Sequence, residues 1–262
     1  MFKNRSERGA SSVGNKYFCW NIDDGLEQDK KITEYLRKCG MGATFNLNSG
    51  IMGKLQMIGR IGDMGIKDIP IENYKPGGFH PIMRFHEEFR IPADEVCQVY
   101  EGFEVASHGL HHENLKAIGD EMARQTILED VKNLSNMFGT PIIGFAYAFG
   151  ASTDAAVLAL KEAGVKYARS VSKAKDFHRP QDLYHMPMTA WHNEKKVFDK
   201  IHAFLEADAA DEDLFFLMFA HGYEFDFGTP TSNWEKFQRI CDLVAGRDDV
   251  KCTSTAEGLG LL

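Results

Sequence analysis

The sequence predicts a single α/β domain, in the form of a (β/α) barrel or a distorted version of one. Short apolar runs alternate along the chain with longer segments whose apolar residues recur every three to four positions, a pattern typical of parallel βα units. The length of 262 residues and the hydrophobic fraction of 44% allow one core of that size. No repeat and no linker divides the chain. A doubly wound open sheet is the alternative.

The elements can be placed in order. The polar residues 1–15 are expected to form a flexible arm, and the domain is expected to cover residues 16–262. The predicted strands are short and apolar and cover residues 16–22, 42–48, 103–107, 141–149, 165–170, 213–220 and 249–254. The predicted helices carry one apolar face and cover residues 26–40, 92–102, 119–138, 152–164, 193–206 and 232–246.

Two segments call for separate comment. Residues 50–92 are less periodic, and we expect helix fragments and long loops there before the helix that starts at Pro92. The helix over 232–246 opens with Ser232 followed three residues later by Glu235, the pattern of a capping box.

Composition excludes several classes of protein. The net charge of −8 and the pI of about 5.7 argue against a nucleic-acid partner. No run of about 18 apolar residues is present, so we expect no membrane partner. The five cysteines are scattered without a CxxC pair, which favours reduced thiols. The N-terminus lacks the apolar region of a secretory signal, so a cytoplasmic location is expected; a secreted, processed form is the alternative.

Polar residues follow several predicted strands at their carboxyl ends. Asp23-Asp24-Gly25 follows the first strand, SHGLHH over 107–112 follows the third, and His221-Gly222 follows the most apolar strand. In a (β/α) barrel these ends meet at one rim, where the active site lies. The sequence therefore predicts one site assembled from separate segments.

The histidine segment has the spacing of a metal site. His108 and His112 are four residues apart, so on a helical turn their rings share one face. His108 and His111 fit a spacing of three equally well, and spacing alone does not choose between them. Zinc accepts imidazole nitrogens together with a carboxylate oxygen, which Asp24 can supply. A polar turn with three unrelated histidines is the alternative.

The two adjacent aspartates can have different tasks. One can hold a metal while the other takes a proton from the water that the metal activates. An acidic turn that caps the next helix is the alternative. His221 can protonate a departing amine, because histidine titrates near neutral pH; a histidine held only by packing is the alternative.

Four segments resemble the polysaccharide deacetylase family, also called the NodB-homology domain. NIDDG, SHGLHH, GFAYAFG and FAHGYEF follow in the family's order, GATFNLNSG is similar as well, and the resemblance extends over about residues 17–227. It implies a distorted barrel of about seven strands that hydrolyses N- or O-linked acetyl groups on a sugar. It also implies one divalent metal ion, usually Zn²⁺, with Co²⁺, Mn²⁺ or Ni²⁺ as alternatives.

The resemblance also implies roles for individual residues. Asp23 corresponds to the general base and His221 to the catalytic acid, and the backbone N–H of Phe149 corresponds to a donor for the oxyanion. The implied metal ligands are Asp24, His108 and His112. This correspondence favours His112 over His111 as the second histidine.

The third motif departs from the family, which commonly has an arginine and a proline before the aromatic-glycine pair. Ala146 and Ala148 stand in this region. The family's arginine orients the catalytic aspartate, and Arg169 at the end of the next predicted strand is the candidate to replace it. The fourth motif is not clear in this sequence. Candidates to line the sugar site are Trp191, His192 and Tyr147.

Two other functions stay open at this stage. A hydrolase of the same fold could cleave another C–N bond, of the cyclic imide or ureide type, which a cytoplasmic location would favour. A barrel could also bind sugar without catalysis, although the complete set of aspartates and histidines argues against it. The partner implied by catalysis is a carbohydrate or another small acetylated substrate, and a homo-oligomer is compatible with the sequence.

Overall fold

A computed structural model describes residues 14–59, 66–67, 79–80, 85–210 and 212–262. Most of the expected arm over residues 1–15 lies outside these residues. Its last two residues are held to the domain, since the Gly14 N–H donates to the Ala209 carbonyl and the Asn15 N–H donates to Asp213.

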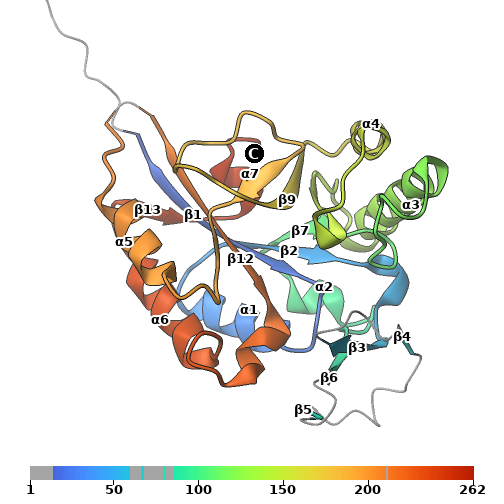
Figure 1. Cartoon of the computed structure of the whole chain (residues 1–262), viewed down its shortest axis with the longest axis horizontal. Coiled ribbons are helices and arrows are strands. Elements are labelled where there is room, and N and C mark those ends of the chain that lie inside the picture. The colour runs from blue at the N-terminus through green and yellow to red at the C-terminus, as the bar shows by residue number, and fades with distance from the viewer. Residues whose placement is uncertain (1–13, 60–65, 68–78, 81–84, 211) are drawn as a thin grey trace, which may run out of the picture.

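In the described part of the chain, nine parallel strands form a sheet that curls into a nearly closed barrel (Figure 1). Its order is β10-β9-β8-β7-β2-β1-β12-β11, with β13 beside β1. The strands are β1 (Lys16–Asp23), β2 (Ala43–Leu47), β7 (Glu104–Ser107), β8 (Gly144–Ala146), β9 (Tyr167–Lys173), β10 (Met186–Met188), β11 (Ala190–Trp191), β12 (Leu214–His221) and β13 (Val250–Cys252).

The two ends of this sheet meet through one short stretch of chain. β10 pairs with β9, β11 pairs with β12, and only Thr189 separates β10 from β11. The distorted (β/α) barrel predicted from the sequence is therefore confirmed, and the open doubly wound sheet is set aside.

Helices cover the outside of the barrel, with α1, α5 and α6 on one side and α3 and α4 on another (Figure 1). The helices are α1 (Asp29–Lys38), α2 (Val96–Val99), α3 (Asp120–Phe138), α4 (Asp154–Glu162), α5 (Val197–Glu206), α6 (Trp234–Val244) and α7 (Thr255–Gly258). The 3-10 turns within the described residues are η1 (Ser49–Ile51), η3 (Ala148–Gly150) and η4 (Gly222–Phe227).

The sequence correctly predicts the end of α1 but not the residue that caps the start of α6. The α1 helix buries Ile32 and Leu36, and the chain leaves it through Gly40 at φ 65°. The capping box predicted for α6 is wrong. Asn233 is the N-cap and accepts from the Lys236 N–H, whereas Ser232 donates its hydroxyl proton to the Glu224 carbonyl.

The core is built on the two central strands, β1 and β12. They pair in parallel over eight residues, and β12 is buried at every residue except His221. Phe18 of β1 stacks on Phe216 of β12 with ring centroids 5.2 Å apart. Burial on both faces is usual for parallel strands, and it holds the carboxyl ends of β1 and β12 firmly in place.

The prediction of helix fragments and long loops over residues 50–92 holds for the 3-10 turn that includes residues 50–51 but is wrong for residues 55–59, 66–67, 79–80 and 85–89, and its remainder over 60–65, 68–78 and 81–84 lies outside the described residues. The four segments where it is wrong form an antiparallel sheet of order β4-β3-β6-β5, made of β3 (Leu55–Gly59), β4 (Ile66–Lys67), β5 (Phe79–His80) and β6 (Phe85–Phe89). These strands have two to five residues, too few to show a clear period. Pairing between distant segments, such as Leu55 with Phe89, decides the structure here.

Candidate active site

The strand register sets the position of the first aspartate. Asp23 is the last residue of β1, level with His221 on β12 and with Asn46 on β2. Its Oδ1 atom accepts a hydrogen bond of 2.7 Å from the Asn46 amide. Asp24 then adopts φ 85°, a left-handed conformation that turns the chain off the strand. The two adjacent carboxylates thereby separate.

The end of β7 delivers the histidines. The His108 N–H donates to the Leu47 carbonyl on β2, and the His108 ring lies with Nδ1 2.7 Å from the Ala146 carbonyl on β8. A carbonyl only accepts, so Nδ1 carries a proton, and in the neutral ring the lone pair is then on Nε2. His112 follows at φ 62°, with its ring centroid 4.8 Å from that of His108.

These side chains fit a divalent metal ion. Asp24 Oδ1 lies 3.7 Å from His108 Nε2 and 3.5 Å from His112 Nε2. Two ligands about 2.1 Å from one tetrahedral ion would be roughly 3.4 Å apart. Asp24, His108 and His112 form a group of potential metal ligands whose atoms all lie within 4.8 Å of one another. His111 instead lies beside Glu113, 3.1 Å away.

The second carboxylate is held by a buried arginine. Nη2 of Arg169 lies 2.7 Å and 2.5 Å from the two carboxylate oxygens of Asp23, and its Nε donates to Asn21. Burial alone would raise the pKa of Asp23, but Arg169 and the nearby histidines outweigh it and hold that pKa below its usual value. Asp23 is therefore ionised and oriented.

Glu224 was not predicted from the sequence, although it lies three residues after His221 on η4. Its Oε2 atom is 3.3 Å from His221 Nδ1 and accepts from the Trp191 indole N–H at 3.0 Å. Burial alone would lower the pKa of His221, yet Glu224 and the two aspartates raise it to about 9. A carboxylate three residues after a strand-end histidine was the signal in the sequence.

Arg90 was also not predicted. It follows β6 of the antiparallel sheet, and its Nη2 lies 3.4 Å from Asp24 Oδ1, with both side chains buried. Burial alone would raise the pKa of Asp24, but His112, Arg90 and other nearby cations hold it well below its usual value. Arg90 comes from the segment whose structure the sequence did not predict, so no pattern could place it here.

Phe149 lies on the rim at the turn after β8. Its backbone has φ 57°, the residue is 59% exposed, and its ring centroid lies 4.8 Å from that of His112. Gly150 follows at φ 67°, where a Cβ atom would lie 2.4 Å from a methyl carbon of Val171. The turn therefore requires glycine, and it carries the Phe149 ring against that of His112.

The three candidates for sugar contact differ in burial. Trp191 is half-buried, and its indole is anchored to Glu224. His192 is fully buried, with Nε2 2.9 Å from the Ser232 hydroxyl, and burial lowers its pKa to about 4. Tyr147 is 1% exposed and stacks on His185. Because a buried ring offers no surface to a sugar, the structure argues against substrate contact for His192 and Tyr147.

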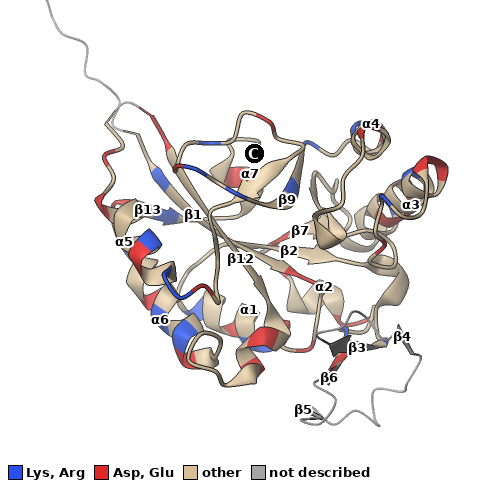
Figure 2. Ribbon diagram, in the orientation of Figure 1, with Lys and Arg blue, Asp and Glu red and all other residues tan. Residues whose placement is uncertain are grey.

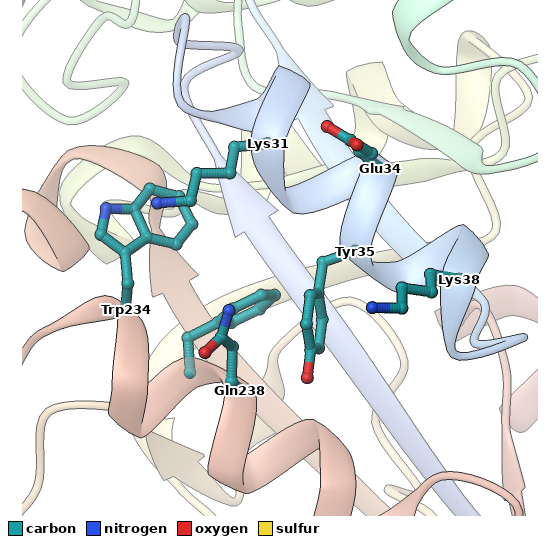
Figure 3. Close-up of a pocket in the computed structure, with 7 residues that line it drawn as sticks. Lys31, Glu34, Tyr35, Lys38, Trp234 and Gln238 are labelled. Carbon is teal, nitrogen blue, oxygen red and sulfur yellow. The ribbon is translucent and has the colours of Figure 1, made fainter.

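A separate hollow of about 250 Å³ lies between α1 and α6 (Figure 3). Its lining residues are Lys31, Glu34, Tyr35, Lys38, Trp234, Phe237 and Gln238. None of them belongs to the aspartate and histidine cluster. Lys31 covers the Trp234 ring at 3.8 Å, and the Tyr35 hydroxyl donates to Asp242, so part of this lining is already engaged.

Carboxylates and imidazoles from β1, β7 and β12 thus converge at the carboxyl ends of a parallel barrel, the place where barrel enzymes carry their active sites. The fold and the position of this cluster are therefore those of a (β/α)-barrel enzyme. The family model described as polysaccharide deacetylase matches residues 11–168, more than half of the sequence. The chain belongs to the polysaccharide deacetylase family. The matched residues end just before Arg169 and do not reach His221.

Solved structures agree with this fold. A family 4 carbohydrate esterase from Streptomyces lividans, in complex with acetate, has a TM-score of 0.52 at 12% identity, over 92% of this chain and 93% of that one. The peptidoglycan deacetylase PdaC from Bacillus subtilis gives 0.53 at 12% identity, over 95% and 93%. The Xyl-CE4 domain of a multidomain xylanase from the hindgut metagenome of Trinervitermes trinervoides gives 0.52 at 13% identity, over 94% and 91%.

A search of curated proteins and an inspection of the helices each gave a negative result. No curated protein sequence matches this chain. Among the described residues, no helix has the length and apolar character needed to cross a membrane.

Proposed function

We propose that this chain is a metal-dependent deacetylase that removes an N- or O-linked acetyl group from a carbohydrate. The observation that carries the proposal is that the adjacent carboxylates of Asp23 and Asp24 have different partners. Asp24 faces the Nε2 atoms of His108 and His112, while Asp23 faces Arg169. Membership of the polysaccharide deacetylase family supports the proposal.

Asp24, His108 and His112 would hold the metal ion, most simply Zn²⁺ with its preference for imidazole and carboxylate. When bound, a divalent ion there supplies a Lewis acid for a carbonyl oxygen and lowers the pKa of water. The hydrogen bond that fixes the His108 tautomer prepares its Nε2 lone pair in advance.

Asp23 serves as the general base in this proposal. Its Oδ2 lies 3.6 Å from His108 Nε2, so its carboxylate borders the metal site without being one of the three grouped ligands. Arg169 keeps it ionised, and Asn46 fixes its orientation. An ionised, oriented carboxylate next to the attacking water can accept that water's proton.

His221 serves as the general acid. Its raised pKa keeps the ring protonated at neutral pH, and Glu224 lies beside Nδ1. The other nitrogen, Nε2, then has its proton available for the departing amine or alcohol. The Phe149 backbone N–H is proposed as the donor that stabilises the oxyanion, and Trp191 as a contact for the sugar.

Acetate release measured together with metal content tests this function. We expect the purified protein to contain about one divalent ion and to release acetate from acetylated oligosaccharides. A chain that binds sugar and releases no acetate in the metal-loaded state would be the non-catalytic barrel. Cleavage of cyclic imides or ureides in place of acetylated sugars would establish the other hydrolase class. The cytoplasmic location stays a prediction.

A further inference from the structure

Three lysines converge on one glutamate beside the candidate active site. The carboxylate of Glu194 contacts the ammonium groups of Lys173 and Lys200, the second at 2.8 Å. The Glu194 carbonyl accepts from the Lys236 ammonium at 3.1 Å. Two ammonium groups thus share one carboxylate, and the cluster keeps a surplus of positive charge.

Two hydrogen bonds and an ion pair connect this cluster to the catalytic groups. The Glu194 carboxylate accepts from the Trp191 N–H at 3.0 Å, and the Trp191 indole reaches Glu224 beside His221. Lys173 is the last residue of β9, four residues after Arg169. At about 3.3 Å per residue, the Cα atom of Lys173 lies at most about 13 Å along the strand from that of Arg169.

The local charge is opposite to that of the whole chain. The protein carries a net charge of −8, yet Lys195 and Lys196 are exposed immediately after Glu194. Figure 2 shows basic and acidic residues together in the chain that leads into α5 and in α5 itself, and over residues 194–200 three lysines outnumber two acidic residues. A basic edge on an acidic protein attracts anions to that edge.

The lysines are accessible and repel each other. The side chains of Lys173 and Lys200 are 47% and 37% exposed. Partial burial and the charge of Lys200 both lower the pKa of Lys173. The shared Glu194 carboxylate offsets only one of the two positive charges, and a second anion beside it would offset the other through charge-assisted hydrogen bonds, which are the strong ones.

We infer that Lys173 and Lys200 bind an anionic substituent of the carbohydrate, a carboxylate or a phosphate, at the rim beside the acetylated position. This inference rests on the proposed function for the identity of the molecule as a deacetylase substrate. The binding of a sugar anion by the lysines can be measured without any deacetylation.

Equilibrium binding to the intact protein provides the test, with ligands that carry no acetyl group and cannot be deacetylated. Tetragalacturonate and cellotetraose have the same length and differ in charge, and glucose 6-phosphate with glucose forms the phosphate pair. We expect the anion of at least one pair to bind about tenfold tighter than its neutral partner. Raised salt should reduce this preference, because exposed charges are screened.

Variants identify the residues responsible. The double variant Lys173→Gln/Lys200→Gln should lose the preference, while Lys132→Gln on the exposed face of α3 should keep it. Glu194→Gln should strengthen anion binding, because it removes the competing carboxylate. A purely structural ion-pair cluster would not produce that increase.

Equal binding within both pairs, or a preference that survives in the double variant, would overturn the inference. Its failure can be told apart from failure of the proposed function. Acetate release with no preference for anions would refute only the lysine site. Anion binding that depends on the lysines, without acetate release from any acetylated sugar in the metal-loaded protein, would refute only the deacetylase.

Discussion

Arg169 contacts both carboxylate oxygens of Asp23, at 2.7 Å and 2.5 Å, across the inside of the barrel. The two residues come from β9 and β1, which are not neighbours in the sheet. Both side chains are buried, and Asn21 accepts from Arg169 Nε. A carboxylate so enclosed would be protonated more easily without the guanidinium. The pair therefore determines the charge of the proposed base.

Replacing Arg169 with alanine should lower kcat by at least about 100-fold, because the pKa of Asp23 rises and its orientation is lost. Breaking a buried ion pair also costs about 3–5 kcal/mol of stability, so the melting temperature should be measured with the rate. Arg124→Ala, at an exposed pair with Glu162, is the control and should leave kcat unchanged. A folded Arg169→Ala protein with a normal kcat would show that Arg169 does not support the base.

Replacing Asp23 with asparagine should separate catalysis from metal binding. The variant should keep its metal, because Asp23 is outside the ligand group, and should lose turnover because an amide cannot accept the proton. His108→Ala should lose both metal and activity. Metal content by elemental analysis and acetate release by assay check the two outcomes. His111→Ala is the matched control, since His111 lies beside Glu113 and should keep both. Full activity in Asp23→Asn would refute the assignment of the base.

The sequence predicts the barrel because its signals are local. The apolar runs that form β1 and β12 and the apolar helical face with Ile32 and Leu36 are readable without the fold. The strand-end rule then brings Asp23, Asp24 and the histidines to one rim. Spacing alone does not separate His111 from His112. Family resemblance makes that choice, and in the structure His112 lies beside Asp24.

Other parts of the site could not be predicted because long-range packing decides them. Arg90 reaches Asp24 from an antiparallel sheet whose strands show no period of their own. The spacing of Glu224 from His221 is readable in the sequence, but its contact with the Trp191 indole depends on β11 lying beside β12. Arg169, by contrast, could be predicted. The arginine expected in the family is absent from the segment before Phe149, Arg169 is the candidate to replace it, and in the structure Arg169 forms an ion pair with Asp23.

Replacing Glu224 with glutamine should change the pH dependence of activity. His221 has a pKa of about 9, so its acid form should be lost as the pH rises through that value. Without the Glu224 carboxylate this pKa falls, and the alkaline limb of the kcat profile should move down by about one pH unit or more. A profile across about pH 6 to 10 measures the shift. Glu235→Gln, at an exposed position in the first turn of α6, should leave the profile unchanged.

The ion pair between His221 and Glu224 should also contribute to the free energy of unfolding, and the raised pKa of His221 determines at which pH it does so. The pKa of His221 is raised above its unfolded value of about 6.5. Its contribution is therefore complete below about pH 6.5 and is lost as the pH rises toward about 9. Glu224→Gln should lower the melting temperature more at about pH 6 than at about pH 9. An equal loss at both values would show that the charge pair does not contribute to stability.

Replacing Gly150 with alanine should disturb the turn that carries Phe149. Alanine at φ 67° is strained, and its Cβ atom would lie 2.4 Å from Cγ2 of Val171, so the turn or Val171 must move. We expect a loss of about 1–3 kcal/mol in the free energy of unfolding, together with a lower kcat because the Phe149 N–H is displaced. Thermal denaturation and acetate release measure the two effects.

Two further variants separate the steric contact from the backbone strain at Gly150. Gly246 has a similar φ of 68°, and a Cβ atom added there would meet nothing within 4 Å, so Gly246→Ala should cost only the strain, about 1 kcal/mol, and leave kcat intact. Gly150→Ala combined with Val171→Ala removes the contacting methyl group. It should recover the part of the stability and the rate that the steric contact costs. If the double variant is no better than Gly150→Ala alone, backbone strain and not Val171 explains the requirement for glycine in this turn.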